Sequence, residues 1–265
     1  MRTPQQDLEA HLQRAVAHHN AGRLAEAEVL YREVLRVRKH HPDAAHQLAI
    51  LTHQRGDTEG ALHLLDRLLK TQPKFAAAHN SRGLMLAMIR RQHEALASFD
   101  RAVSLDPAYA LAWINRGNLL AALGRHDQAL ASYDRAISAQ PGHAEPFYAK
   151  GLFLHEHGRT EDALVCYGQA LSIRPEFPEA LNNRGTLLEQ GGRADDALTD
   201  FARAIALRPG FAEALNNQGA ALDRLGRHND ARASFERAVS SRPDFIGARM
   251  NLAAMLFTLR FGWRR

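Results

Sequence analysis

Amide side chains recur along this sequence at a spacing that could hold another polypeptide. One row with a 34-residue step contains Asn115, Asn183, Asn217 and Asn251. Beside this row lie Asn80, Asn118, Asn182 and Asn216. A side-chain amide has donors and an acceptor, which match the acceptor and the donor of a peptide bond. A row of such amides could therefore bind the backbone of an extended chain almost independently of its sequence.

The same amides have a second possible role. Asparagine is a poor residue in the middle of a helix unless its side chain finds a partner. The amides could therefore brace neighbouring helices or cap turns instead. Ser81 and Ala149 interrupt the row, which argues against continuous binding along it. We expect the amides to bind a partner chain, and bracing is the alternative.

An acidic row accompanies the amides in the second half of the chain. Glu145, Glu179 and Glu213 share the 34-residue step. Local charge decides which sequences approach a surface, even when the whole protein is cationic. We therefore expect this part of the chain to prefer neutral or basic segments.

These rows belong to a periodicity that runs through nearly the whole sequence. Glycines, prolines, small residues and mostly aromatic residues each recur at 34-residue steps. The glycines are Gly22, Gly56, Gly124, Gly158, Gly192 and Gly226, and the prolines are Pro73, Pro107, Pro141, Pro175, Pro209 and Pro243. A fixed period of this length is typical of a solenoid, in which one supersecondary unit stacks on the next.

Each unit has the pattern of two antiparallel helices. In residues 110–143, apolar residues recur at helical spacing until Gly124, which permits the left-handed turn that ends the first helix. The second helix ends before Pro141, because proline lacks the amide donor. Gly117 and Ala129 are small because larger side chains would hold the two backbones apart. Arg90 replaces a turn glycine, so we expect its turn to be the least regular.

Residues 110–143 resemble a tetratricopeptide repeat (TPR). The matching residues are Trp113, Gly117, Leu120, Gly124, Ala129, Tyr133, Ala136 and Pro141. The resemblance implies an all-α fold, a right-handed superhelical solenoid of antiparallel helix pairs. Repeats are expected at 8–41, 42–75, 76–109, 110–143, 144–177, 178–211 and 212–245, with a half-repeat at 246–265 and an N-terminal tail at 1–7.

The asparagine row resembles the superhelical TPR region of O-linked N-acetylglucosamine transferases and their bacterial relatives, in which such a row grips protein substrates. Asn115, Asn183, Asn217 and Asn251 match that row. The catalytic domain of these enzymes is absent from this sequence, so no activity is implied here. A different TPR site, the carboxylate clamp for acidic tails, needs Lys or Arg on a groove row that here carries apolar, aromatic, histidine and amide residues, so it is excluded.

The composition excludes several classes of protein. Apolar runs are far shorter than the roughly 18 residues of a membrane span, and residues 1–7 lack a signal-peptide core. We therefore expect a cytoplasmic protein that does not bind membranes. The formal charge of +5 could suggest nucleic acid, but the arginines are scattered. The densest basic run, Arg32 to Lys39, is predicted to be a solvated helix face.

No set of catalytic or metal-binding residues is evident. The period accounts for the glycines, so none of them forms a phosphate-binding loop. Histidine pairs such as His18 and His19 lack a carboxylate or thiol partner at ligand spacing. Cys166 is the single cysteine and is predicted to be a packing residue. We expect no enzyme activity, no cofactor and no metal.

The last residues, 246–265, predict a helix without a second helix to cover it. This helix carries Met250, Leu252, Met255, Leu256 and Phe257, with Trp263 beyond. An apolar patch of this kind marks an interface, so we expect it to bind a second copy or a further domain.

The sequence as a whole predicts a non-enzymatic scaffold or adaptor that binds an extended segment of a partner protein in a concave groove. One alternative is the substrate-recruiting arm of a glycosyltransferase whose catalytic domain lies outside this chain. A self-assembling array is a third possibility.

Overall fold

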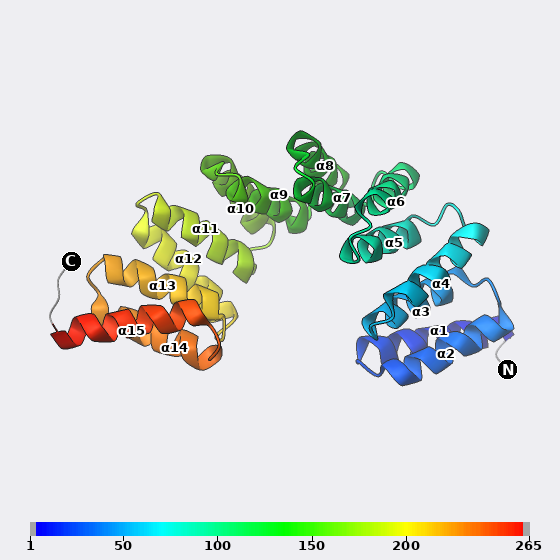
Figure 1. Cartoon of the computed structure of the whole chain (residues 1–265), viewed down its shortest axis with the longest axis horizontal. Helices are drawn as coiled ribbons and strands as arrows, with labels where there is room; N and C mark the ends of the chain where they lie inside the picture. Colours follow the sequence, from blue (N-terminus) through cyan, green and yellow to red (C-terminus); the bar gives the residue numbers. More distant parts are fainter. Residues whose placement is uncertain (1–3, 262–265) are drawn as a thin grey trace. The chain divides into compact units, whose positions relative to one another are not determined.

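The computed structural model describes residues 4–261, which form fifteen α-helices and no strands (Figure 1). Consecutive helices pack as antiparallel pairs, each made of a first helix and a second helix. The predicted all-α solenoid of helix pairs is therefore confirmed. None of the described helices is both long and apolar enough to cross a membrane.

The chain divides into two compact units, Met1–Ala139 and Gln140–Arg265. The first unit contains four pairs: α1 (Pro4–Asn20) with α2 (Leu24–Val37), α3 (Pro42–Gln54) with α4 (Thr58–Thr71), α5 (Ala76–Met88) with α6 (Gln92–Leu105), and α7 (Ala110–Ala122) with α8 (His126–Ala139). The first helices of successive pairs lie next to each other in this unit. Because α1 begins at Pro4, its first turn lies in the segment that the sequence predicts as a tail.

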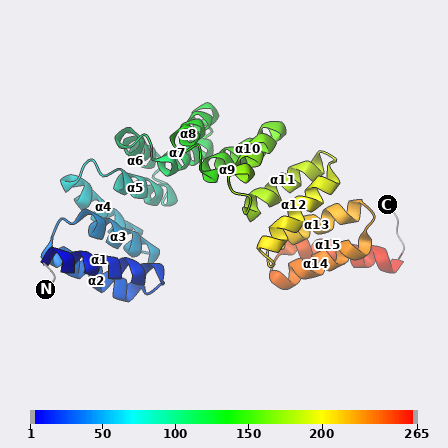
Figure 2. The same ribbon diagram turned by 180° about the vertical axis from the view of Figure 1, so that it is seen from behind.

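The second unit contains three pairs and a final helix. The pairs are α9 (Ala144–Glu156) with α10 (Thr160–Ile173), α11 (Pro178–Gln190) with α12 (Ala194–Leu207), and α13 (Ala212–Arg224) with α14 (His228–Ser241). The final helix, α15 (Ile246–Phe261), packs on α13 and α14 (Figure 2). The first helices α11, α13 and α15 therefore form one continuous row in this unit.

A small residue facing an aromatic ring sets the distance between the helices of a pair. A Cβ atom placed on Gly117 would lie 2.8 Å from Cε1 of Tyr133, and one placed on Gly219 would lie 2.6 Å from Cε1 of Phe235. Both distances are shorter than real Cβ contacts. The aromatic rings are buried, with Tyr133 2% and Phe235 3% exposed. The glycines thus allow each ring to fill the space between two helices, as the sequence predicts for Gly117.

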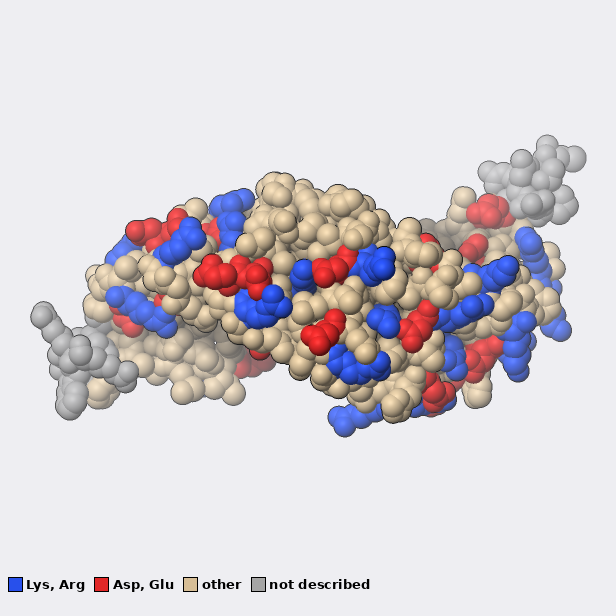
Figure 3. Space-filling view, turned by 90° about the horizontal axis from the view of Figure 1, so that it is seen from above, with Lys and Arg blue, Asp and Glu red and all other residues tan. Residues whose placement is uncertain are grey.

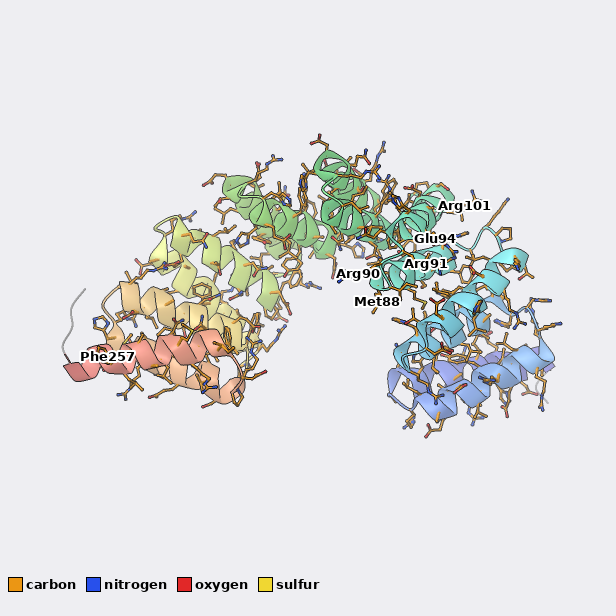
Figure 4. The ribbon with its side chains drawn as sticks, in the orientation of Figure 1. Met88, Arg90, Arg91, Glu94, Arg101 and Phe257 are labelled. Atoms are coloured by element: carbon orange, nitrogen blue, oxygen red, sulfur yellow. The ribbon has the colours of Figure 1, made fainter. Side chains whose placement is uncertain are left out.

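The turn inside each pair is left-handed, and Arg90 adopts it as well (Figure 4). Arg90 has a φ of 61°, close to the 72° of Gly124. The backbone hydrogen bonds are also the same: Arg91 N donates to Leu86 O at 2.9 Å, as Arg125 N does to Leu120 O at 2.9 Å. The expectation that the Arg90 turn is the least regular is therefore wrong. The side chain carries a steric cost in this conformation, but the backbone closes the turn regardless.

Candidate functional site

The asparagines of the row join successive first helices through hydrogen bonds. In each contact the side-chain Nδ2 donates to the side-chain Oδ1 of an asparagine 35 residues earlier. These contacts are Asn115 to Asn80 at 2.9 Å, Asn217 to Asn182 at 3.0 Å and Asn251 to Asn216 at 2.9 Å. We call them the amide bridges. They connect α5 with α7, α11 with α13, and α13 with α15, so the bracing role considered for these amides is real.

Other residue pairs make a hydrogen bond at the same positions where one or both of the asparagines are replaced. Asn183 Nδ2 donates to the hydroxyl of Tyr148 at 3.2 Å, between α9 and α11. His46 Nε2 lies 2.8 Å from Oγ of Ser81, between α3 and α5. Both pairs are 35 residues apart. The 35-residue separation was visible in the sequence as two asparagine rows offset by one residue. That the two rows bond to each other could not be predicted without the angle between neighbouring helices.

The amide bridges leave part of each row amide available. Asn115, Asn217 and Asn251 are half-buried. Among the hydrogen bonds of the described residues, none has the carbonyl oxygen of these three side chains as its acceptor. Bracing and binding are therefore compatible, because the bridge uses the Nδ2 group of the amide and leaves its carbonyl oxygen oriented and able to accept a hydrogen bond.

Three of the predicted site residues have a different environment. Asn80 and Asn182 are only 3% and 7% exposed, so they lie beneath the row and support it. Asn182 Nδ2 also donates to Oδ1 of Asn183 at 3.1 Å. Asn118 is exposed, and its Oδ1 accepts a hydrogen bond from the hydroxyl of Tyr133 at 2.7 Å. Asn118 thus continues the polar surface one turn further along α7.

Burial affects the tyrosines that bond to these amides. It raises the pKa of Tyr148, and it also raises the pKa of Tyr109, whose hydroxyl accepts from Asn80 Nδ2 at 3.4 Å. Hydrogen bonds from Asn183 and Asn80 oppose this effect without reversing it. Both hydroxyls therefore stay protonated at neutral pH, and the amide network is uncharged.

Each glutamate of the acidic row is paired with an arginine 29 residues later. Glu145 bonds to Arg174 at 2.6 Å, Glu213 to Arg242 at 2.7 Å, and Glu179 to Arg208. Burial tends to raise the pKa of Glu179, but the hydrogen bond and charge of Arg208 outweigh it and lower the pKa. The pairing balances the charge of the row. It removes the physical basis for the predicted preference for neutral or basic segments.

The same arginines stack on the phenylalanines that end each repeat, directly before the next first helix. The guanidinium carbon lies 3.5 Å from the ring centroid for Arg174 and Phe177, 4.5 Å for Arg208 and Phe211, and 4.1 Å for Arg242 and Phe245. Contacts of this kind add cation–π attraction to the ion pair. Sequence reasoning missed these arginines, although they follow the 34-residue step themselves.

A second polar network joins first helices to second helices. Arg116 Nε donates to Asp100 at 2.6 Å, and its Nη1 donates to Ser132 at 2.7 Å. Arg184 forms two bonds of 2.7 Å with Asp200, which is 2% exposed. Asp200 also raises the pKa of Arg184, mainly through these hydrogen bonds. This network lies among the helices, so we assign it to stability.

On the face shown in Figure 3, charged side chains of both signs are interspersed. The basic run at Arg36, Arg38 and Lys39 is exposed, in agreement with a solvated face. Within the described part of the chain, no group of three or more His, Cys, Asp or Glu residues is placed to hold a metal ion.

Stacked antiparallel helix pairs, each with a small residue facing an aromatic ring or, in the second pair, Leu65, define a helical-repeat protein. The chain belongs to the tetratricopeptide repeat family. Models described as tetratricopeptide repeat match residues 6–84, 110–143, 182–244 and 216–260, and a model described as TPR repeat matches residues 151–192. No curated protein sequence gives a significant match to the chain.

Solved TPR structures are similar to this chain. YrrB, a TPR protein with an unusual peptide-binding site, is 24% identical over 70% of this chain and 96% of its own, with a TM-score of 0.55. MamA is 25% identical over 61% and 95% of the two chains, with a TM-score of 0.54. Yeast Tom70 is 17% identical over 97% and 56%, with a TM-score of 0.74. These structures share the TPR fold of this chain.

Proposed function

We propose that this protein is a non-enzymatic scaffold whose second unit binds an extended segment of a partner protein along Asn183, Asn217 and Asn251. The observation that carries this proposal is the set of amide bridges. Two of them hold Asn217 on α13 and Asn251 on α15, and the Tyr148 hydroxyl holds Asn183 on α11 in the same way; the carbonyl groups of Asn217 and Asn251 can still accept. The described peptide-binding site of the similar TPR protein YrrB supports the same class of ligand.

The spacing of the row suits an extended backbone. Packed helices lie about 8–10 Å apart, and an extended chain advances about 3.3 Å per residue. One amide therefore meets about every third peptide unit, and the three amides span about six or seven residues. Each bound amide would accept from a backbone N–H or donate to a backbone carbonyl of the partner.

In the proposed groove, the paired glutamates form the edge. Glu179 and Glu213 lie four residues before Asn183 and Asn217, on the same face of their helices. Glu145 has the equivalent place on α9. In the first unit, Asn115 and Asn118 would form a separate surface of the same kind, with Asn80 beneath it as support. Because arginines balance the glutamates, we expect binding to depend on backbone shape more than on charge.

The test first selects a peptide from a random library by its binding to the unaltered protein. It then measures the affinity of three variants for that peptide. Changing Asn183, Asn217 and Asn251 together to alanine should weaken binding at least tenfold in calorimetry. The fold should persist by circular dichroism, since alanine favours helix and offsets part of the lost bridges. The matched control changes two exposed amides on second helices, Gln169 and Asn229, to alanine and should leave the affinity unchanged.

A third variant separates bracing from binding. Changing Asn182 and Asn216 to alanine breaks two amide bridges but keeps the row amides. We expect a smaller loss of affinity, because the row amides lose their orientation but not their groups. If the triple variant lowers only stability and binds the peptide normally, the row serves bracing alone and the proposal is wrong.

A further inference from the structure

The exposed face of α15 is the face that other first helices bury against their second helices. A leucine at one repeat position shows this directly. Five equivalents, Leu86, Leu120, Leu154, Leu188 and Leu222, are 0%, 0%, 1%, 5% and 5% exposed. Leu256 on α15 has the same position in the repeat and is 46% exposed. Within residues 4–261 no second helix covers it.

Ala253 gives the same result at the point of closest approach. Its equivalents are Ala15, Ala49 and five glycines, all of them buried where the two helices of a pair meet. Ala253 is exposed. Ile246 and Met250, on the same side of α15, are 69% and 67% exposed. The opposite side of α15 is packed, with Ala248 0% and Met255 4% exposed.

We propose that this face of α15 binds an amphipathic helix of a partner protein, antiparallel to α15, as each second helix binds its first helix. The argument is continuity with a contact that the chain already makes in every complete repeat. The sequence predicts a second copy or a further domain at this surface, and Trp263, part of that prediction, lies outside the described residues. This proposal is independent of the amide row, because it concerns the outward side of α15.

The side chain of Ala253 restricts the partner helix further. Where glycine has this position, a Cβ would lie 2.6–2.8 Å from the opposing aromatic ring, so a ring could face Ala253 only in a shifted position, as Tyr31 faces Ala15 in the first repeat, whereas a leucine is smaller and fits more easily. In the second repeat, Ala49 has this position, and Leu65 has the position of the ring; both are 0% exposed. The partner helix should therefore present a small residue, a leucine four residues later and another three beyond, as α4 does with Ala61, Leu65 and Leu68.

A suitable probe is a synthetic peptide with the sequence of residues 57–72, because this segment contains α4 and its residue pattern. Asp57 is the N-cap of this helix, and its Oδ1 accepts from Gly60 N at 2.8 Å, which helps a short peptide to become helical. A control peptide carries Leu65→Ala. Alanine favours helix more than leucine does, so any loss of binding comes from the missing side chain.

The experiment measures anisotropy of the labelled peptide with the full chain. We expect saturable binding, and binding at least ten times weaker for the Leu65→Ala peptide. On the protein, Ala253→Arg should weaken binding at least tenfold by filling the contact point. The matched control, Val165→Arg, alters a 60% exposed residue on α10 and should change nothing. Both variants alter exposed positions and should keep their circular dichroism.

Three results would overturn the proposal. The first is no saturable binding of the residue 57–72 peptide. The second is equal binding of the two peptides, or equal binding by Ala253→Arg and the unaltered protein. The third is a dimer of the unaltered chain in light scattering that Ala253→Arg converts to a monomer, because a second copy would then occupy this face.

Discussion

Replacing Gly219 with alanine tests whether the aromatic ring of Phe235 sets the distance between α13 and α14. An added Cβ would lie 2.6 Å from Cε1, 2.8 Å from Cδ1 and 3.0 Å from Cζ of the ring. Phe235 is 3% exposed, so the ring has little room to move. The two helices must separate, or the ring must leave its preferred rotamer.

The expected cost follows from two opposing terms. Overpacking a core by one methyl group costs about 1–3 kcal/mol, while alanine is about 1 kcal/mol better than glycine inside a helix. The net destabilisation should be about 1 kcal/mol. Ala15 and Tyr31 in the first repeat occupy the equivalent positions, both 0% exposed, so a methyl group facing a ring can be accommodated. This places the cost in the lower part of the range.

A double-mutant cycle with Phe235→Leu isolates the contact. Ala49 and Leu65 show that alanine and leucine fit together at these positions. The double variant should therefore be more stable than the sum of the single changes implies. Urea unfolding should be followed by circular dichroism and by hydrogen exchange of α13 and α14, because a repeat array can open locally. A stabilising Gly219→Ala change, or strict additivity, would refute the reasoning.

Three further changes test other parts of the structure. Arg90→Gly should raise the urea midpoint, with a gain of about 0.5–1 kcal/mol, because glycine adopts the positive φ without steric cost; a lower midpoint would contradict this. Burial lowers the pKa of His46 below 6.5 against the opposing charge of Asp43, so the unfolded chain binds more protons and stability falls as the pH drops below about 6.5. His46→Asn should flatten that fall in thermal melts at pH values around this range, and an unchanged pH profile would argue against it. Asp200→Ala should cost about 1–3 kcal/mol in urea unfolding, a discounted range because Arg184 can turn partly to water; a neutral effect would show that water replaces the pair fully.

The helix pairs could be predicted from the sequence because their causes are local and repeated. Gly117 and Tyr133 lie in one repeat, and each has equivalents at the 34-residue step. Seven copies of one pattern leave little choice of fold. The Arg90 turn was mispredicted because the pattern implied that a left-handed turn needs glycine. The structure shows that a neighbouring framework can hold an arginine in that conformation.

The contacts between repeats were harder to predict. Whether Asn217 meets Asn182 or a ligand depends on the rotation between α11 and α13, which no residue pattern states directly. The partner of Glu213 was missed for a related reason. Arg242 lies in the loop after α14. The direction of its side chain depends on the path of that loop, which also places Phe245 before the next helix. Rows of one residue type therefore identify a surface, but the residues that they contact depend on how the neighbouring helices and loops are oriented.

The contacting residues are always the same number of positions apart in the sequence, and this constant separation determines how the chain can gain or lose length. In the second unit the bonds that Asn183, Asn217 and Asn251 make with Tyr148, Asn182 and Asn216 all join residues 35 apart, and each glutamate–arginine pair of the acidic row lies within one repeat. Excising residues 178–211 would bring Asn217 to the place opposite Tyr148 that Asn183 now has, and would join Phe177 directly to Ala212 in the register of Phe211. Duplicating the same segment would add one more set of these pairs and leave the existing separations unchanged. Gain or loss of one whole repeat therefore requires no new kind of contact at these positions, whereas an insertion of any other length would separate every pair that spans it.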